Sequence, residues 1–159
     1  MTARLAHLVR RFFGVLGAAP LSPAEQAEAA ALLRPAETGP FWGQPVADQR
    51  HALEAARIVA GLAPGRRDLA RAALLHDVGK RHSRLGILGR SLASGLELVH
   101  LPTPGRLGRY LDHGPEGAAE LEALGAEPIV VAFAGHHHGD PPPGVDPSDW
   151  AVLAASDEP

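Results

Sequence analysis

Residues 74–80 read Leu-Leu-His-Asp-Val-Gly-Lys. They form the end of a predicted apolar helix, where a histidine is followed directly by an aspartate. The predicted buried stripe of the helix has i, i+3, i+4 and i+7 spacing and consists of Leu69, Ala72, Ala73 and His76. Asp77 follows about 100° further round the helix, so His76 and Asp77 can face one point in space. The sequence therefore predicts that both side chains border a common site.

The expected end of this helix favours a cation beside Asp77. Gly79 is predicted to stop the helix, which places Asp77 in the last turn, at the negative end of the helix dipole. A carboxylate is unfavourable there unless a positive charge lies beside it. Lys80 is the only lysine of the chain, among 15 Lys and Arg residues, which favours a position that needs a compact ammonium group. A bound metal ion would also remove the conflict.

Composition indicates a soluble globular protein with one domain over residues 1–159. The chain is 45% hydrophobic and 21% charged, which is ordinary for such a domain. It has no cysteine, so disulfides and thiolate metal sites are excluded, and a cytoplasmic location is expected. No apolar run is long enough to span a membrane, and the net charge of −3 argues against nucleic acid as a partner.

Apolar periodicity and helix-capping residues predict an all-α fold, with no convincing strand. A capping box at Ser22–Glu25 starts the second helix of an N-terminal hairpin, residues 1–40, which packs on a core of residues 45–159. Residues 35–45 are expected to be a linker held to the core by Phe41 and Trp42. The expected helices are 2–16, 23–34, 46–62, 67–78, 85–99, 107–111, 115–124, 128–137, and a last helix capped by Ser148.

Histidines and carboxylates lie at helix ends or on buried stripes of separate segments. They are His51, His76, Asp77, His113, His136 or His137, and Asp157. Taken alone, His51 fits a core histidine at the start of an apolar stripe with Ala55, Ile58 and Leu62. Together, imidazoles and carboxylates without sulfur suit Zn, Mn, Fe, Co or Ni better than Ca or Mg. Six ligands exceed the need of one tetrahedral ion, so two divalent ions bridged by Asp77 are an alternative to one.

The ordered set of these residues resembles the HD-domain metal-dependent phosphohydrolase superfamily. The resemblance rests on Asp48-Gln49-Arg50-His51, on His76-Asp77-Val78-Gly79-Lys80 and on Ala155-Ser156-Asp157. It implies an all-helical bundle of about seven to nine helices. It also implies that His51, His76, Asp77 and Asp157 are the core metal ligands.

Two further segments are similar to the binuclear HD-GYP phosphodiesterases. Residues 113–118, His-Gly-Pro-Glu-Gly-Ala, resemble their His-Pro-Glu-x-Gly-Ala segment, and His136-His137 resembles their paired histidines. Because His138 follows directly, the matching pair can be His136-His137 or His137-His138. Residues 140–144, Asp-Pro-Pro-Pro-Gly, stand where the Gly-Tyr-Pro signature would be, so the resemblance does not extend to that signature.

The resemblance implies a metal-dependent phosphohydrolase or phosphodiesterase that hydrolyses a nucleotide or another small phosphoester with a metal-activated water. Asp77 and Lys80 are the expected catalytic residues, with Lys80 in the place of a phosphate-contacting lysine. Arg81 and Arg84 are expected to bind substrate with Lys80, or else to form a solvated basic turn. The alternatives are a di-iron HD-type oxygenase and a non-catalytic metal-binding signalling module.

Overall fold

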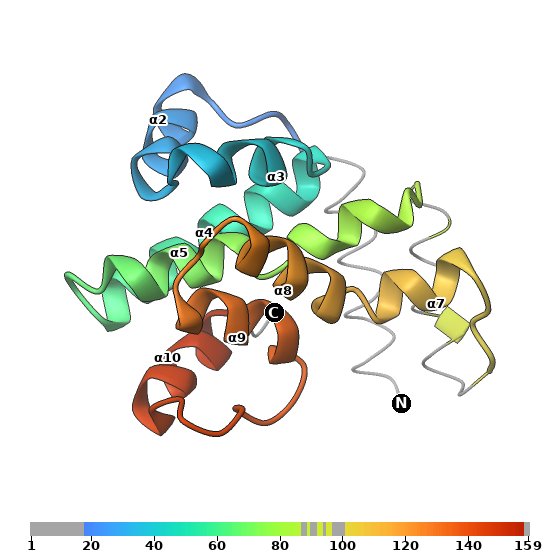
Figure 1. The fold of residues 1–159 in the computed structure, drawn as a ribbon. Helices are drawn as coiled ribbons and strands as arrows, with labels where there is room; N and C mark the ends of the chain where they lie inside the picture. Colours follow the sequence, from blue (N-terminus) through green and yellow to red (C-terminus); the bar gives the residue numbers. More distant parts are fainter. Residues whose placement is uncertain (1–17, 87–88, 90–91, 94, 97–100, 158–159) are drawn as a thin grey trace, which may run out of the picture.

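The chain folds into helices packed in a bundle (Figure 1). The structure is a computed structural model that describes residues 18–86, 89, 92–93, 95–96 and 101–157. These residues form eight α-helices and two 3₁₀ helices, with no strand, which confirms the predicted all-α fold. The elements are α2 (Pro23–Leu32), η1 (Pro35–Glu37), α3 (Thr38–Trp42), α4 (Val46–Leu62), α5 (Arg67–Leu75), η2 (Val78–Ser83), α7 (Arg106–Leu111), α8 (Gly114–Ala123), α9 (Pro128–His136) and α10 (Pro147–Asp157).

Two predicted helices fall wholly or partly outside the described residues. The helix expected over residues 2–16 lies outside them, and so does much of the helix expected over 85–99. Within the second range, residues 89, 92, 93, 95 and 96 are helical. Among the helices of the described chain, none is long and apolar enough to cross a bilayer.

The segment expected to be a linker is helical. Ser22 and Glu25 form the predicted capping box of α2, in which the Glu25 backbone N–H donates to the Ser22 hydroxyl at 3.3 Å. Instead of an extended linker, residues 35–42 form η1 and α3. Phe41 is fully buried, as expected, but Trp42 is 37% exposed and packs edge-on against Phe41.

Helices α4 and α5 run side by side through the middle of the molecule, and the other helices pack around them (Figure 1). Helix α9 packs on α5 and α8, while α10 crosses α4 and α5. The buried face of α4 consists of Ala52, Leu53, Ala55, Ala56 and Val59. The buried face of α4 therefore differs from the predicted apolar stripe. Leu62 is 55% exposed, and the His51 side chain lies half-exposed at the edge of the buried face.

The helix that carries the His-Asp pair ends earlier than predicted. Helix α5 stops at Leu75, His76 is its C-cap, and the chain turns at Asp77 into η2. Gly79 is not a left-handed C-terminal glycine of this helix, since its φ is not positive. Its role is a tertiary contact, since a Cβ added there would lie 2.1 Å from the His113 carbonyl oxygen.

The last helix begins two residues earlier than expected, and its cap is a different residue. Helix α10 starts at Pro147, a favoured residue for the first helical position. The Asp146 carboxylate accepts hydrogen bonds from the Ser148 backbone N–H, at 2.7 Å, and from the Ser148 hydroxyl. Asp146, and not Ser148, therefore caps α10. Trp150 anchors this helix by packing edge-on against Phe133, with ring centroids 5.4 Å apart.

Candidate metal centre

Histidines and aspartates from five segments converge in the interior of the bundle. Their imidazole nitrogens and carboxylate oxygens form three overlapping groups, in each of which all donor atoms lie within 4.8 Å of one another. The groups are His51, His76 and Asp77; His76, His137 and Asp157; and His113, His137 and His138. His76 and His137 each belong to two groups, so the three groups form one continuous cluster.

Glycines allow the segments that carry these ligands to approach closely. Gly79 of η2 lies against the backbone of α8, where its added Cβ would be 2.8 Å from the Gly117 nitrogen. One turn earlier on α8, a Cβ on Gly114 would lie 2.8 Å from the Gly135 carbonyl oxygen of α9. Because no side chain separates these backbones, His113 at the start of α8 comes within reach of both Asp77 and His137.

Backbone carbonyls orient three of the imidazoles. The Nδ1 atom of His76 lies 2.7 Å from the Ala73 carbonyl oxygen, and that of His113 lies 2.8 Å from the Tyr110 carbonyl oxygen. The Nδ1 atom of His137 is 3.1 Å from the carbonyl oxygen of Ala134. A carbonyl oxygen only accepts, so each Nδ1 carries the proton and each Nε2 of the neutral ring presents a lone pair to the cluster.

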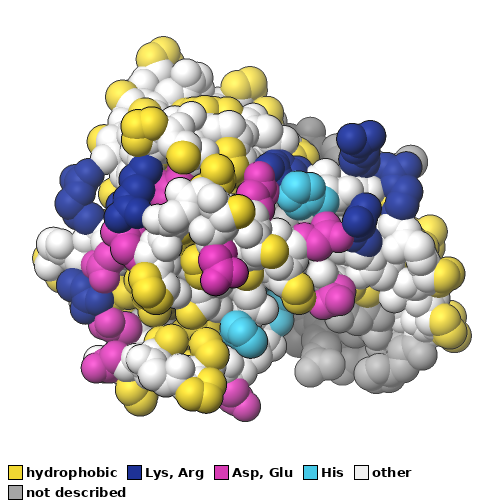
Figure 2. All heavy atoms as spheres, in the orientation of Figure 1, with side chains coloured by type: hydrophobic (Ala, Val, Ile, Leu, Met, Phe, Trp, Pro, Cys, Tyr) yellow, Lys and Arg dark blue, Asp and Glu magenta, His cyan; other side chains and the backbone are white. Residues whose placement is uncertain are grey.

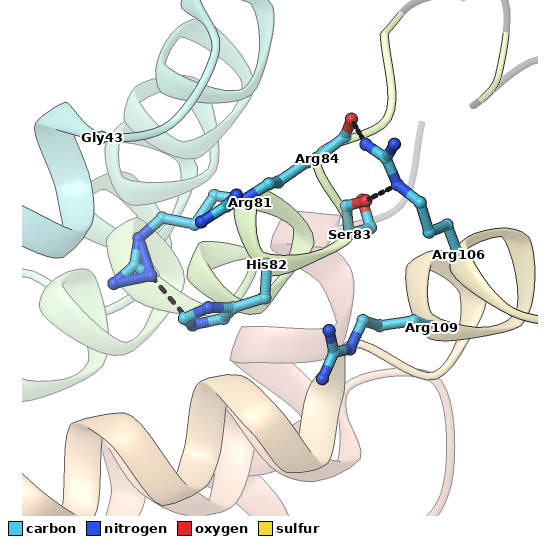
Figure 3. A pocket seen from close by; sticks show the side chains of 7 residues that line it. All are labelled: Gly43, Arg81, His82, Ser83, Arg84, Arg106 and Arg109. Atoms are coloured by element: carbon cyan, nitrogen blue, oxygen red, sulfur yellow. Dashed lines mark hydrogen bonds between the residues drawn. The ribbon is translucent and has the colours of Figure 1, made fainter.

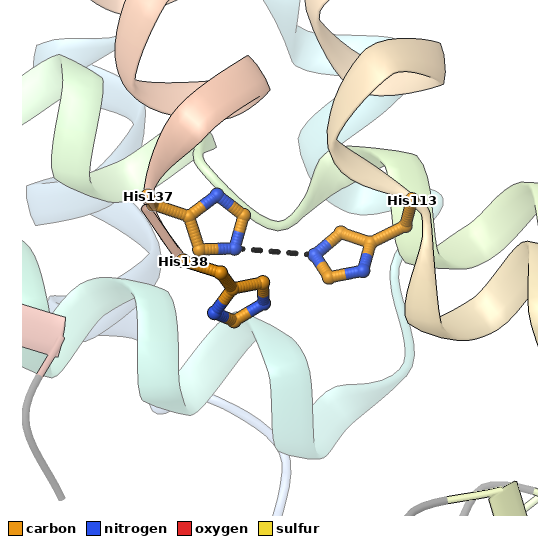
Figure 4. Close-up of side chains that lie close together, drawn as sticks. All are labelled: His113, His137 and His138. Carbon is orange, nitrogen blue, oxygen red and sulfur yellow. Dashed lines mark hydrogen bonds between the residues drawn. The ribbon is translucent and has the colours of Figure 1, made fainter. Parts of the chain in front are cut away.

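Two of these lone pairs face each other. The Nε2 atoms of His113 and His137 are 3.2 Å apart, and His138 lies beside both rings (Figure 4). Two neutral rings whose protons are on Nδ1 cannot hydrogen-bond to each other through Nε2. A cation held by these nitrogens would turn an unfavourable contact into coordination.

His76 has an unsatisfied nitrogen at the centre of the cluster. Its ring is 1% exposed, and its Nε2 makes no hydrogen bond with any residue of the described chain. The neighbouring carboxylate oxygens are Asp157 Oδ1 at 3.1 Å and Asp77 Oδ2 at 3.3 Å. Buried polar atoms are normally paired, so this nitrogen between two carboxylates indicates a position for a cation.

The two oxygens of Asp77 face different members of the cluster. Oδ1 lies 3.0 Å from Nε2 of His113 and 3.5 Å from Nε2 of His137. Oδ2 lies 2.5 Å from Nζ of Lys80, in a pair that is almost fully buried. Burial acts to raise the pKa of Asp77, but His76 and Lys80 outweigh it and hold this pKa well below its usual range. Asp77 is therefore an ionised carboxylate shared by both sides of the cluster.

The histidines of the cluster differ in their tendency to hold a proton. Burial, together with the neighbouring rings of His137 and His113, lowers the pKa of His138 to about 4. Burial also lowers the pKa of His137. Burial opposes a charge on His76 as well, but Asp77 and Asp157 raise its pKa to about 10. Without a metal, a proton on His76 balances the two carboxylates, and a divalent cation would replace it.

The residues present fit a transition-metal site. The cluster offers imidazole nitrogens and carboxylate oxygens, a donor set that suits Zn, Mn, Fe, Co and Ni. Three of the histidines have the backbone hydrogen bonds that orient metal-binding imidazoles in proteins. The unsatisfied Nε2 of His76 and the opposed nitrogens of His113 and His137 are the observations that a bound cation would explain.

The structure brings together most of the predicted ligands, with one change among the consecutive histidines. His51, His76, Asp77, His113, His137 and Asp157 are all in the cluster. His136 is exposed on α9 and belongs to none of the three groups, whereas His138 belongs to one. Helix α9 ends at His136, and the turn that follows brings His137 and the exposed His138 beside His113. By this geometry, His137 and His138 lie in the cluster and His136 does not, and the choice of metal ligands among them stays a prediction.

The structure separates Lys80 from the two arginines expected to act with it. The Lys80 ammonium group lies in the cluster, against Asp77. Arg81 and Arg84 line a different cavity together with Gly43, Arg106 and Arg109 (Figure 3). Arg81 forms an ion pair with Glu120 of α8 on that side.

Sequence reasoning missed the structural role of Gly117 and of Gly135. A Cβ added to Gly117 would lie 3.0 Å from the Gly79 nitrogen, and one added to Gly135 would lie 3.2 Å from the Ala118 Cβ. Neither glycine has a positive φ. The sequence feature that comes closest to indicating these contacts is the i, i+3 spacing of Gly114 and Gly117 on α8. This spacing leaves one face of the helix without long side chains. A single sequence does not show which of its glycines face another backbone.

Removal of residues 157–159 is expected to lower metal content and thermal stability together. Asp157 Oδ1 lies 3.1 Å from Nε2 of both His51 and His76, so its loss removes the carboxylate that joins these two rings. If the bound metal is present at about 100 times its Kd, its loss lowers the Tm by roughly 5–10 °C. Metal analysis and thermal denaturation measure both effects, and removal of residues 158–159 alone is the control. Unchanged metal content in the longer deletion would mean that Asp157 is not a ligand.

Comparison with protein-family models found a match. The family model described as HD domain matches residues 49–155, which includes the segments that supply every member of the cluster except Asp157. Comparisons with curated proteins and with solved structures found no match.

Proposed function

The chain belongs to the HD-domain family, and from that premise we propose that it is a metal-dependent phosphohydrolase or phosphodiesterase acting on a small phosphoester, with a nucleotide as the preferred class. The observation that carries the proposal is the buried cluster of imidazoles around Asp77, with an ammonium group 2.5 Å from the same carboxylate. HD-domain proteins are mostly metal-dependent hydrolases, and this cluster has the donors that such chemistry uses.

The proposed metal ligands are the residues of the cluster. They are His51, His76, Asp77, His113, His137, His138 and Asp157. Divalent ions bound there would withdraw charge from phosphate oxygens and lower the pKa of a water molecule, which then attacks phosphorus near neutral pH. The proposal allows one or two ions, because Asp77 Oδ1 lies 3.0 Å from Nε2 of His113 and Oδ2 lies 3.3 Å from Nε2 of His76.

Lys80 is proposed to stabilise a non-bridging phosphate oxygen. Its side chain is 9% exposed, and its Nζ contacts Asp77 at the edge of the cluster. Burial acts to lower the pKa of Lys80, but Asp77 outweighs it and the pKa is raised, so the group is a fixed positive charge. A fixed charge of this kind stabilises the negative charge that develops on phosphate in the transition state.

A cavity of about 280 Å³ adjoins the histidines of the cluster. Its lining includes His137 and His138, together with Asp112, which precedes α8, and Pro115 in the first turn of α8. It is close to the lower limit of the volumes of small-molecule sites. We propose that a compact phosphoester reaches the cluster from this side.

The proposal is tested by measuring phosphate release from a panel of nucleotides, cyclic nucleotides and dinucleotides with Mn, Fe, Co, Ni or Zn. Metal-stimulated hydrolysis of at least one compound is expected. The di-iron oxygenase alternative predicts instead iron in the purified protein and a near-infrared mixed-valent absorption. A non-catalytic module predicts neither hydrolysis nor the mixed-valent absorption. Absence of hydrolysis with every metal and compound would contradict the proposal.

Replacement of Lys80 by methionine is expected to reduce kcat without removing the metal. The methionine side chain keeps much of the apolar stem but not the charge, so a transition-state interaction worth about 10²–10³ in kcat is lost. Steady-state kinetics and metal analysis of the same preparation separate the two effects. If metal content falls in proportion to kcat, Lys80 acts by holding Asp77 and does not contact substrate.

A further inference from the structure

A second cavity, of about 670 Å³, lies on a different side of η2 from the metal cluster. It is lined by Gly43, Arg81, His82, Ser83, Arg84, Arg106 and Arg109. None of these residues belongs to the three groups of metal-binding side chains. Basic side chains gather on this part of the surface, near α7 (Figure 2).

The lining is strongly positive. It contains four arginines and one histidine but no carboxylate. In Figure 3, Arg81 and Arg84 extend along one side of the cavity, while Arg106 and Arg109 reach it from α7 on the other. Guanidinium groups from two elements therefore face the same space.

Two of the arginines are held from behind by carboxylates of α8. Glu120 accepts hydrogen bonds from both terminal nitrogens of Arg81, one of them at 2.8 Å, and Glu116 accepts from Nε of Arg109 at 2.6 Å. Both glutamates lie outside the cavity lining. These ion pairs fix the positions of Arg81 and Arg109 but neutralise only two of the four charges.

The other two arginines have no carboxylate partner among the described residues. Arg106 instead holds the turn at the end of η2, because its Nε donates to the Ser83 carbonyl oxygen at 2.8 Å and another nitrogen donates to the Arg84 carbonyl oxygen. Arg84 has φ of 50°, a left-handed conformation that side chains other than glycine rarely adopt. The turn is thus held in an unfavourable conformation that places one more guanidinium group at the cavity.

We propose that this arginine-lined cavity binds a small anion with two or more adjacent phosphate groups, at a site separate from the metal cluster. Guanidinium groups form paired hydrogen bonds with phosphate oxygens, and several of them around one space favour an anion with several charges. The cavity volume is in the range of small-molecule sites. The inference does not depend on the hydrolase activity proposed above.

The test measures binding of inorganic tripolyphosphate to the full-length protein by isothermal titration calorimetry. Arg84→Gln and Arg106→Gln are each expected to weaken binding by about tenfold or more, because each removes a charged hydrogen-bond donor. Arg57→Gln, an exposed arginine of α4 outside the cavity, is the matched control and should bind as the wild type does. Lys80→Met should also retain this binding, because Lys80 lies in the metal cluster.

Several results would overturn the proposal. Wild-type affinity in both Arg84→Gln and Arg106→Gln would place the anion elsewhere, including at bound metal. An equal loss of affinity in Arg57→Gln would show that tripolyphosphate is attracted by the general positive charge of the surface. An equal loss of affinity in Lys80→Met would show that the cavity and the metal cluster form one binding site. Displacement of tripolyphosphate by single-stranded RNA at much lower concentration would identify a polymer as the ligand instead.

Discussion

Replacement of Asp77 by asparagine is expected to remove most of the bound metal and to lower kcat/KM by at least about 10²-fold, since partners that only orient a ligand already contribute 10–100-fold. Asparagine keeps the size of the side chain but not its charge. The two oxygens of Asp77 lie 3.0 Å from Nε2 of His113 and 2.5 Å from Nζ of Lys80. The substitution therefore affects both sides of the cluster.

The same substitution is expected to destabilise the metal-free protein. Asp77 and Lys80 form a buried ion pair, and removal of one partner leaves a buried charge without compensation, at a cost of about 3–5 kcal/mol. Metal analysis, kinetics and denaturant unfolding measure the three effects. Asp112→Asn, an exposed aspartate next to His113 in the sequence, is the control and should keep wild-type metal content. Wild-type metal content in Asp77→Asn would remove Asp77 from the ligand set.

Replacement of Gly79 by alanine is expected to destabilise the fold by about 3 kcal/mol or more, at the upper end of the usual cost of overpacking. The added Cβ would lie 2.1 Å from the His113 carbonyl oxygen and 2.8 Å from the Gly117 nitrogen. Both atoms belong to backbone, so no side-chain rotation relieves the clash. Helix α8 must move away from η2, and His113 moves with it away from Asp77.

Gly61→Ala is the matched control for this prediction. Gly61 lies in α4, and a Cβ there would meet nothing within 4 Å. Alanine in a helix restricts the unfolded chain, so this variant should be more stable than the wild type by about 0.4–1 kcal/mol. Thermal and urea unfolding compare the two variants, and metal analysis shows whether the shift of α8 also affects the cluster. A Gly79→Ala protein as stable as the wild type would show that η2 and α8 separate at little cost.

The helices were predictable where apolar periodicity extends over many residues or a capping residue marks the start. Helix α4 has the predicted bounds 46–62, and α9 begins at Pro128 as expected, because proline suits a first helical position. The convergence of separate helices on one site was predicted only through the order of the histidines and aspartates. Periodicity alone would have left His51 as an ordinary residue at the edge of a helix.

The errors have local physical causes. Gly79 fits a helix C-terminus in sequence, but its contact with His113 and Gly117 is tertiary and leaves no local pattern. The three consecutive histidines have the same chemistry, so only the end of α9 at His136 determines which ones lie in the cluster. Arg81 and Arg84 follow Lys80 in the chain, but the turn of η2 directs them to another cavity.

The geometry also explains why the cluster needs a cation. Three of its seven residues are histidines whose Nδ1 protons are donated to backbone carbonyls, so their Nε2 lone pairs face the cluster. Asp77 and Asp157 add two negative charges there. Without a metal ion, a proton on His76 balances the two carboxylates, but the lone pairs of His113 and His137 remain without favourable partners.

Whether these side chains bind metal is decided by mass-spectrometric metal analysis of the purified protein. After loading with Mn, Fe, Co, Ni or Zn and removal of free ions, we expect one or two divalent transition-metal ions per chain in the wild type. Asp77→Asn should retain only a small fraction of that content. A wild-type protein that holds no more metal than its Asp77→Asn variant with every ion would contradict the claim that these side chains form a metal centre.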